Sequence, residues 1–538
     1  MEQRMTTKAQ LLTIIALGAA LEIASAQTTQ TTAAAPAPVA PVLSPTEQTI
    51  YDLKNPLSWL TWGGDLRVRN EYFNNAQSLT SASSISDPHS SVLFGELHSQ
   101  DYFRFRGRLW TTITPTEDLS LNVRLAAEPR DFMEPSSSDT YYKGEGMQWR
   151  YGIFDSLNVQ WKKPADLPVT VTVGRQDIFK DDGWLVGDGT PEDGSFTYFL
   201  DSARLTWDLK EYHTTVDMIG IIQCARPDAW LPTLGPSTSL GGDPEPYLLT
   251  DQNEKGAVLS IANHSLPAAN LEGFFIYKHD SRLDSAPEAT FGDNGDIYTV
   301  GGQVSGVLND HWTYMAEGAY QFGQKQDPEL NGQPTPSNPL GGPNPLLAPS
   351  AQTTGFRDLS AFGVNSKLSY LFKDQMNNQL NLSFEFLTGD NPNTKTDEMF
   401  DVLWGRWPSW SEMYNVYSYV QETRVGQTAN LYRIGPTWNF TPLKDLNFST
   451  SYYALFADQS VPTRDLNETL NPALGLPATP GPFTTTGVFR GHFIQAVLKY
   501  KFTQHMSGHL WGEVLFPGDF YVDRSLMTFL RAELMFTL

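Results

Sequence analysis

The stretch that decides the fold runs from Val169 to Leu209 and has the sequence VTVTVGRQDIFKDDGWLVGDGTPEDGSFTYFLDSARLTWDL. Its first residues alternate, with valines at 169, 171 and 173 on one face and threonines between them, which predicts a β-strand. An acidic, glycine-rich loop follows, and the stretch ends in a second alternating segment with Ala203, Leu205 and Trp207 on one face. The stretch therefore predicts a hairpin with one apolar face, one polar face and a long polar loop.

The rest of the chain repeats this plan. From Trp62 onward, about eighteen segments alternate at period two. Long connections span residues 74–100, 129–148, 177–197, 225–252, 280–295, 323–356, 389–427 and 458–486. Short connections between them span residues 115–117, 162–167, 210–211, 309–310, 442–443 and 503–504.

Alternation of long and short connections along a meander places all long loops at one end and all tight turns at the other. This pattern is typical of outer-membrane barrels, and aromatic residues near strand ends fit their girdles. The sequence therefore predicts an all-β fold: a single transmembrane antiparallel β-barrel of about 18 strands, with long extracellular loops and short periplasmic turns. The alternative is a large soluble β-protein, such as a propeller or a sandwich, in which the loops lack this two-ended asymmetry.

The N-terminal residues indicate export. Arg4 and Lys8 precede a short apolar stretch, and the segment Ala24-Ser25-Ala26 fits a signal-peptidase site, which predicts a cleaved signal peptide over residues 1–26. An anchor helix is the alternative, but the apolar run is too short to span a bilayer. We expect a disordered Ala/Thr/Pro-rich spacer over residues 27–58, the barrel over residues 59–538, and localisation in a Gram-negative outer membrane.

Composition excludes several classes of function. The net charge of -23 and the absence of a basic domain argue against nucleic acid as a partner. A single cysteine, Cys224, excludes an intramolecular disulfide framework. No metalloprotease, P-loop, nucleophile-elbow or dinucleotide-binding motif is present, so we expect neither an enzyme nor a cofactor.

Arginines occupy the polar faces of the predicted strands. An arginine facing lipid at mid-membrane costs about 2–4 kcal/mol, so Arg104, Arg106 and Arg108, which alternate with Phe103, Phe105 and Leu109, are expected to face the barrel interior. The full set of predicted pore-lining residues is Arg67, Arg69, Arg104, Arg106, Arg108, Arg124, Arg175, Arg204, Arg433 and Arg531.

Two interpretations of these arginines remain open. They could pair with Asp65, Glu71, Asp208, Glu385 and Glu533 and only stiffen the wall, or some could stay unpaired and select anions, as charged rings do in pores. We predict partial pairing with a net positive constriction. Because an arginine fork matches a carboxylate in bidentate fashion, such a pore suits a uronic-acid polymer.

Four stretches carry a family resemblance. VGRQDIFKDDGWLVGDG with FLDSARLTWDL (Val173–Leu209) resembles a hairpin of the bacterial alginate-export outer-membrane proteins. NLYRIGPTW (Asn430–Trp438), GHLWGEVLFPGDFY (Gly508–Tyr521) and the closing FLRAELMFTL (Phe529–Leu538) are similar to that family's last strands. The resemblance covers about Trp59 to Leu538. It implies an eighteen-stranded barrel with an arginine-rich constriction that passes a secreted polyanionic polysaccharide. The terminal Leu538 departs from the aromatic residue that often ends such barrels.

Together these observations predict an outer-membrane channel that exports an anionic, alginate-like polyuronate by passive, charge-selective passage. The expected partners are the polysaccharide and outer-membrane lipid, with periplasmic polysaccharide-secretion components as further candidates. A general or small-anion-selective porin is the alternative function, followed by a barrel with a plugged interior and a barrel hydrolase.

Two long loops contain further candidate residues. Asp181, Asp182, Asp188 and Asp193 are weak candidates for Ca²⁺ ligands, but they lack EF-hand spacing, so a solvated loop is favoured. Trp404, Trp407 and Trp410 could stack on sugar rings or pack their loop over the pore, and packing is favoured.

Overall fold

The structure is a computed structural model, and it describes residues 44–75, 99–134, 147–187, 199–224, 253–281, 294–326, 356–391, 394–405, 410–413, 429–460, 484, 486–522 and 524–538. The chain divides into two compact units, residues 1–51 and residues 52–538. The predicted signal peptide, Asp188, Asp193 and Trp407 lie outside the described residues.

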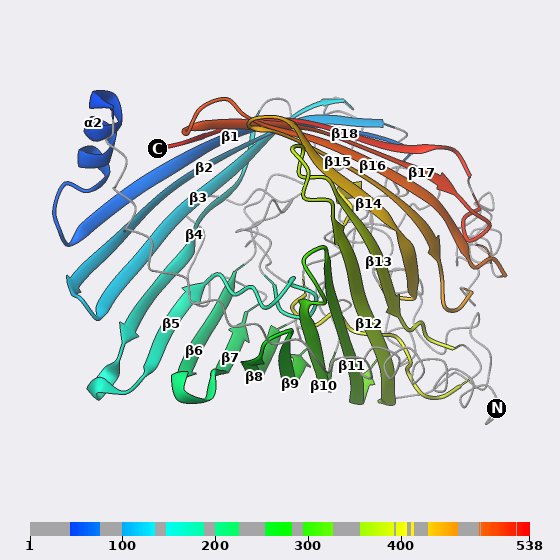
Figure 1. Cartoon of the computed structure of the whole chain (residues 1–538). Coiled ribbons are helices and arrows are strands. Elements are labelled where there is room, and N and C mark those ends of the chain that lie inside the picture. The colour runs from blue at the N-terminus through cyan, green and yellow to red at the C-terminus, as the bar shows by residue number, and fades with distance from the viewer. Residues whose placement is uncertain are drawn as a thin grey trace. The chain divides into compact units, whose positions relative to one another are not determined.

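The second unit contains eighteen antiparallel strands (Figure 1). They are β1 (Leu60–Asn74), β2 (Ser99–Thr116), β3 (Leu119–Glu134), β4 (Met147–Lys162), β5 (Val169–Gln176), β6 (Leu200–Leu209), β7 (Thr214–Gln223), β8 (Asn253–Leu266), β9 (Ala269–Ser281), β10 (Asn294–Val307), β11 (Trp312–Gln326), β12 (Arg357–Leu371), β13 (Gln379–Leu387), β14 (Leu431–Leu443), β15 (Leu446–Phe456), β16 (Phe489–Lys501), β17 (Met506–Pro517) and β18 (Met527–Thr537).

Pairing of β1 with β18 closes the sheet into a barrel, because every other strand pairs with its neighbours in the sequence. The β1–β18 register sets Leu66 opposite Phe536 and Glu71 opposite Arg531. The closed antiparallel barrel of eighteen strands confirms the fold predicted from the alternating segments.

The two faces of the barrel wall differ as the alternation predicts. Leu66 and Leu109 are exposed on the outer face, whereas Arg67, Arg69 and Arg104 are buried inside. Many other large apolar residues are exposed on strands around the barrel, including Val173, Leu259, Leu382, Ile494 and Leu530. A continuous apolar outer face is unfavourable in water and favourable in lipid, which identifies the barrel as a membrane-spanning one.

The connections follow the predicted plan, with small differences. The eight predicted long connections all join strands that the structure describes. Prediction missed the short turns at residues 267–268 and 372–378 and the connection at residues 518–526. Short 3-10 segments, Pro164–Asp166 and Lys210–Tyr212, form two of the tight turns.

A helix, α2 (Pro45–Lys54), lies within the segment predicted as a disordered spacer. The backbone N–H of Glu47 donates to the side chain of Ser44 at 3.3 Å, which caps the first turn in the manner of an S-x-x-E motif. Among the described residues, no helix is long and apolar enough to cross a membrane.

Candidate functional site: the barrel interior

An arginine-rich cluster covers the interior face of β18, β1 and β2. The register places Arg67 opposite Arg106 and Arg69 opposite Arg104 across β1 and β2, because both strands present their polar face to the interior. Residues that share a face of one strand repeat about every 7 Å, so the side chains form rows. The cluster consists of Arg67, Arg69, Arg104, Arg106, Arg108 and Arg531 with Asp65, Glu71, Glu128, Glu412 and Glu533.

Glu71 is at the centre of this cluster. It accepts from Arg531 Nε at 2.8 Å and lies 3.3 Å from Arg104 and 3.4 Å from Arg69. Tyr102 donates its hydroxyl to the same carboxylate at 2.7 Å. These five side chains therefore supply one another with hydrogen bonds and ion pairs in a buried site. A buried charge is tolerated under that condition.

Further carboxylates complete the cluster. Glu128 accepts from Arg67 at 2.9 Å and also bonds Arg104, and Glu533 lies 2.6 Å from Arg69. Glu412, from a long loop, reaches Arg531 at 2.9 Å.

Arg106 is the least well paired of these arginines. Its nearest described carboxylate, Asp65, is 3.7 Å away, whereas Arg108 bonds the same aspartate at 2.8 and 2.5 Å. Arg106 Nε has no hydrogen-bond partner among the described residues, although the residue is buried. Counting only described residues, the cluster holds one arginine more than it holds carboxylates.

The other four predicted arginines lie on separate strands and do not join this cluster. Arg124 bonds Asp155 at 2.7 Å and Asp177 at 2.8 and 2.9 Å. The remaining three also have carboxylate partners: Arg175 with Asp201, Arg204 with Asp217 and Arg433 with Glu385. Each of the ten arginines thus has a carboxylate within 4 Å, and the degree of pairing separates Arg106 from the others.

Sequence reasoning missed a second feature, which we call the inner plug: residues 177–187 and 397–405, from two long loops, fold into the barrel interior. Val186 and Trp404 form a parallel bridge between the two loops. The N–H of Gly187 donates to Trp404 O at 2.7 Å, and the N–H of Trp404 donates to Leu185 O at 3.1 Å. The loops therefore form one joined element.

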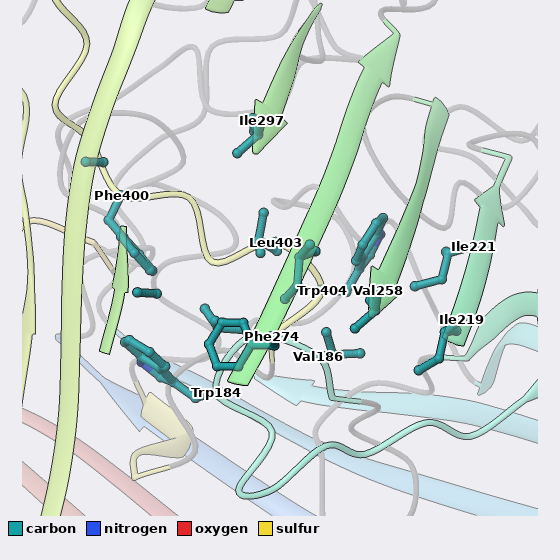
Figure 2. Packing of buried hydrophobic residues seen from close by; sticks show 14 of the residues in the cluster. Trp184, Val186, Ile219, Ile221, Val258, Phe274, Ile297, Phe400, Leu403 and Trp404 are labelled. Carbon is teal, nitrogen blue, oxygen red and sulfur yellow. The ribbon is translucent and has the colours of Figure 1, made fainter. Parts of the chain in front are cut away.

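Apolar side chains attach the inner plug to the wall. Figure 2 shows Trp184, Val186, Phe400, Leu403 and Trp404 packed among inward-facing residues of β7 to β10. Those wall residues are Ile219, Ile221, Val258, Phe274 and Ile297. Burial of these aromatic and aliphatic groups corrects the expectation that the loop after β5 is solvated throughout, since Trp184, Leu185 and Val186 are all buried.

Two wall glycines make room for the plug aromatics. A Cβ at Gly363 on β12 would lie 2.8 Å from the Phe400 ring and 3.0 Å from the Trp184 ring. A Cβ at Gly256 on β8 would lie 2.4 Å from the Trp404 ring, and also 2.0 Å from a backbone oxygen. Only glycine allows such close approach of ring and wall.

Polar contacts add to the packing. Trp184 donates its indole N–H to Glu385 at 3.2 Å, and Trp404 donates its indole N–H to Glu254 at 2.8 Å. Asp401 pairs with Lys325 of β11 at 3.1 Å and with Lys278 of β9 at 3.6 Å. Burial opposes ionisation of Asp401, but Lys278 and Lys325 outweigh it, so its pKa lies below the usual range. The ionised aspartate therefore holds the plug to β9 and β11 through two ion pairs, which we call the Asp401 latch.

The other predicted loop residues have separate positions. Asp182 accepts from Asn365 Nδ2 at 2.7 Å, whereas Asp181 is exposed. Within the described part of the chain, no three metal-ligating side chains are grouped to hold an ion. Trp410 packs against Tyr453 and Phe493 in a second apolar cluster, and the Arg433 guanidinium lies 5.2 Å from its ring centroid.

A closed barrel with an apolar outer face and a charged interior defines an outer-membrane protein of the channel class. The model of the alginate-export family matches residues 248–531, which is more than half of the chain, and the chain belongs to that family. The resemblance to the alginate-export proteins that the sequence showed is therefore confirmed. No curated protein matches the chain.

Several solved structures resemble the barrel at low identity. A BenF-like porin from Pseudomonas fluorescens Pf-5 is 9% identical with a TM-score of 0.48, over 89% of this chain and 98% of that one. OccAB2 of Acinetobacter baumannii is 10% identical with a TM-score of 0.47, over 89% and 98%. OccK2 (OpdF) of Pseudomonas aeruginosa, solved in complex with glucuronate, is 10% identical with a TM-score of 0.44, over 89% and 98%.

Proposed function

We propose that this protein is an outer-membrane channel that exports an anionic polysaccharide, an alginate-like polyuronate, by passive and charge-selective passage. The observation that carries the proposal is the row of arginines on the interior face of β18, β1 and β2, in a member of the alginate-export family. Its partners would be the polymer, outer-membrane lipid and components of a periplasmic secretion apparatus.

Arg106 supports a binding step without covalent chemistry. Its contact to Asp65 is long, and its Nε has no hydrogen-bond partner among the described residues, so this guanidinium favours an anion that reaches it. The neighbouring arginines hold their own carboxylates more tightly, at 2.6 to 2.9 Å. A uronate would exchange hydration for a guanidinium contact weak enough to release it, which transport requires.

Substitution of Arg106 by glutamine tests this role. We expect anion selectivity in planar bilayers to fall, and the polyuronate concentration for half-block to rise about tenfold, as loss of one charged contact worth about 1.4 kcal/mol implies. Lys210→Gln is the matched control, because this exposed lysine lies in a short turn and carries the same charge. Unchanged block in Arg106→Gln would refute the assignment.

A porin selective for small anions is the second candidate, supported by the same cationic wall. The two functions differ in their response to chain length. A polymer channel should be blocked by a uronate oligomer at far lower residue concentration than by the monosaccharide, because linked residues raise the effective concentration at successive sites. Equal block per residue would favour the porin.

A further inference from the structure

The inner plug meets the wall at a group of carboxylates that the proposed function does not use. Glu272 of β9, Gln303 of β10 and Glu317 of β11 lie in one row across three paired strands. Adjacent strands are about 4.8 Å apart, so Gln303 alone separates the two glutamates. Asp181 and Asp182 of the plug lie beside this row, because the preceding Lys180 is 3.0 Å from Glu272 and Asp182 accepts from Asn365 of β12, the strand next to β11.

Among the residues that the structure describes, few cations compensate these carboxylates. Lys180 of the plug lies 3.0 Å from Glu272 and 3.5 Å from Asp217 of β7, and it donates to Ser260 of β8. Arg204 of β6 is already bonded to Asp217. Asn365 of β12, which bonds Asp182, is uncharged. The described groups at this contact therefore include five carboxylates, namely Asp181, Asp182, Asp217, Glu272 and Glu317, and two cations, Lys180 and Arg204.

One oxygen of the buried Glu317, Oε2, has no hydrogen-bond partner among the described residues. An unsatisfied carboxylate oxygen beside other carboxylates is unfavourable when ionised, and protonation removes both the charge and the repulsion. Packing of the plug against the wall, which we call the seated state, should therefore be coupled to proton uptake.

We propose that the inner plug is a proton-sensitive gate, which packs against the wall when Asp181 and Glu317 are protonated and loosens when they are ionised. Asp181 keeps part of its surface in solvent, but its partial desolvation between plug and wall, followed by the charge of Glu272, raises its pKa to about 6, in agreement with this direction. A group whose pKa is raised in the seated state favours that state below its raised pKa and loses the effect as pH rises through it. The seated state is the one that the structure describes.

The gate requires only that the protein is a channel, whatever its solute, so ion conductance tests it separately from polymer export. In planar bilayers with KCl, mean conductance of the full-length protein should fall between about pH 7.5 and about pH 5. If the pKa of one carboxyl differs by about one unit between the seated and the loosened plug, the ratio of seated to loosened molecules changes about tenfold with pH.

Two variants should shift the gate in opposite directions. Asp181→Asn with Glu317→Gln mimics protonation, so conductance should be low at both pH values. Lys180→Gln removes the compensating cation, so conductance at about pH 7.5 should exceed that of the unmodified protein. General misfolding cannot produce both results, and heat-modifiable migration on gels verifies that each variant folds.

Asp310→Asn is the control, because the Asp310 carboxylate is 93% exposed in a tight turn and the pH response should persist. A conductance that does not change with pH in the unmodified protein overturns the proposal. So does an Asp181→Asn, Glu317→Gln double variant that keeps the full pH response. If the double variant loses the pH response but is still blocked by polyuronate as the unmodified protein is, the gate is supported and the proposed export function is unaffected.

Discussion

At the residue scale, Glu71 is the best-connected charge of the interior. Three arginines and Tyr102 share its carboxylate, and both Glu71 and Arg531 are fully buried. Neutralising one member of such a buried set leaves its partners without compensation, which is the costly way to alter a buried ion pair.

Substitution Glu71→Gln should therefore lower the free energy of unfolding by about 3–5 kcal/mol. Urea unfolding of the barrel in lipid or detergent measures this loss. Asp310→Asn should change the same quantity by less than about 0.5 kcal/mol, because its carboxylate is in water. Equal effects of the two substitutions would contradict the structural importance of the Glu71 site.

Sequence alternation indicates which side chains face the interior, but it cannot indicate their partners. Arg69 bonds Glu533, which is 464 residues away, because β1 closes the barrel against β18. The alternation by itself would also allow Arg104, Arg106 and Arg108 to be replaced together by glutamate without unfolding the barrel, because it places those side chains on a polar face. Arg104 is instead 1% exposed between Glu71 and Glu128, so a glutamate there would join two carboxylates.

At the element scale, the inner plug depends on close contact with the wall. The three atoms nearest to a Cβ at Gly363 belong to the rings of Phe400 and Trp184, at 2.8 to 3.0 Å, so a Gly363→Val variant would collide first with the plug. We expect the variant to unseat the plug, raise ion conductance and expose the plug to protease. Gly220→Val on β7 is the control, since no atom lies within 4 Å of its Cβ position. A similar effect of both substitutions would exclude displacement of the plug as the cause.

The Asp401 latch should respond to substitution but not to mild acid. Because its pKa is lowered by Lys278 and Lys325, its stabilising effect is complete above the unfolded-state value of about 4 and is lost only below it. Asp401→Asn should therefore raise conductance at both about pH 7.5 and about pH 5. An increase confined to one of these values would contradict a latch that stays ionised.

The plug also marks where sequence reasoning fails at this scale. Strands are predictable because lipid and interior impose a period of two on every segment. Trp184, Phe400 and Trp404 follow no period, and their partners lie on strands far away in the chain. Their aromatic character in otherwise polar loops was the available signal, and for the tryptophans of the later loop it favoured packing over sugar stacking.

At the scale of the whole molecule, the two-ended arrangement of loops predicts topology. The long connections should be extracellular, and the short turns should be periplasmic. An epitope inserted within residues 76–98 should be accessible on intact cells, whereas one at Lys210 should be accessible only after rupture of the outer membrane. The opposite pattern would invert the assigned orientation.

Insertion of the barrel in a membrane can be tested by placing an arginine on the outer face at two different depths. Leu109 lies near the middle of β2 and is 53% exposed, whereas Leu443 lies at a tight turn and is 65% exposed. An arginine costs about 2–4 kcal/mol at the bilayer midplane but about 0–1 kcal/mol near its edge. In lipid, Leu109→Arg should therefore destabilise the barrel far more than Leu443→Arg. A soluble β-protein would tolerate both substitutions equally, because both side chains would already be in water, so equal unfolding free energies would refute the barrel's insertion in a membrane.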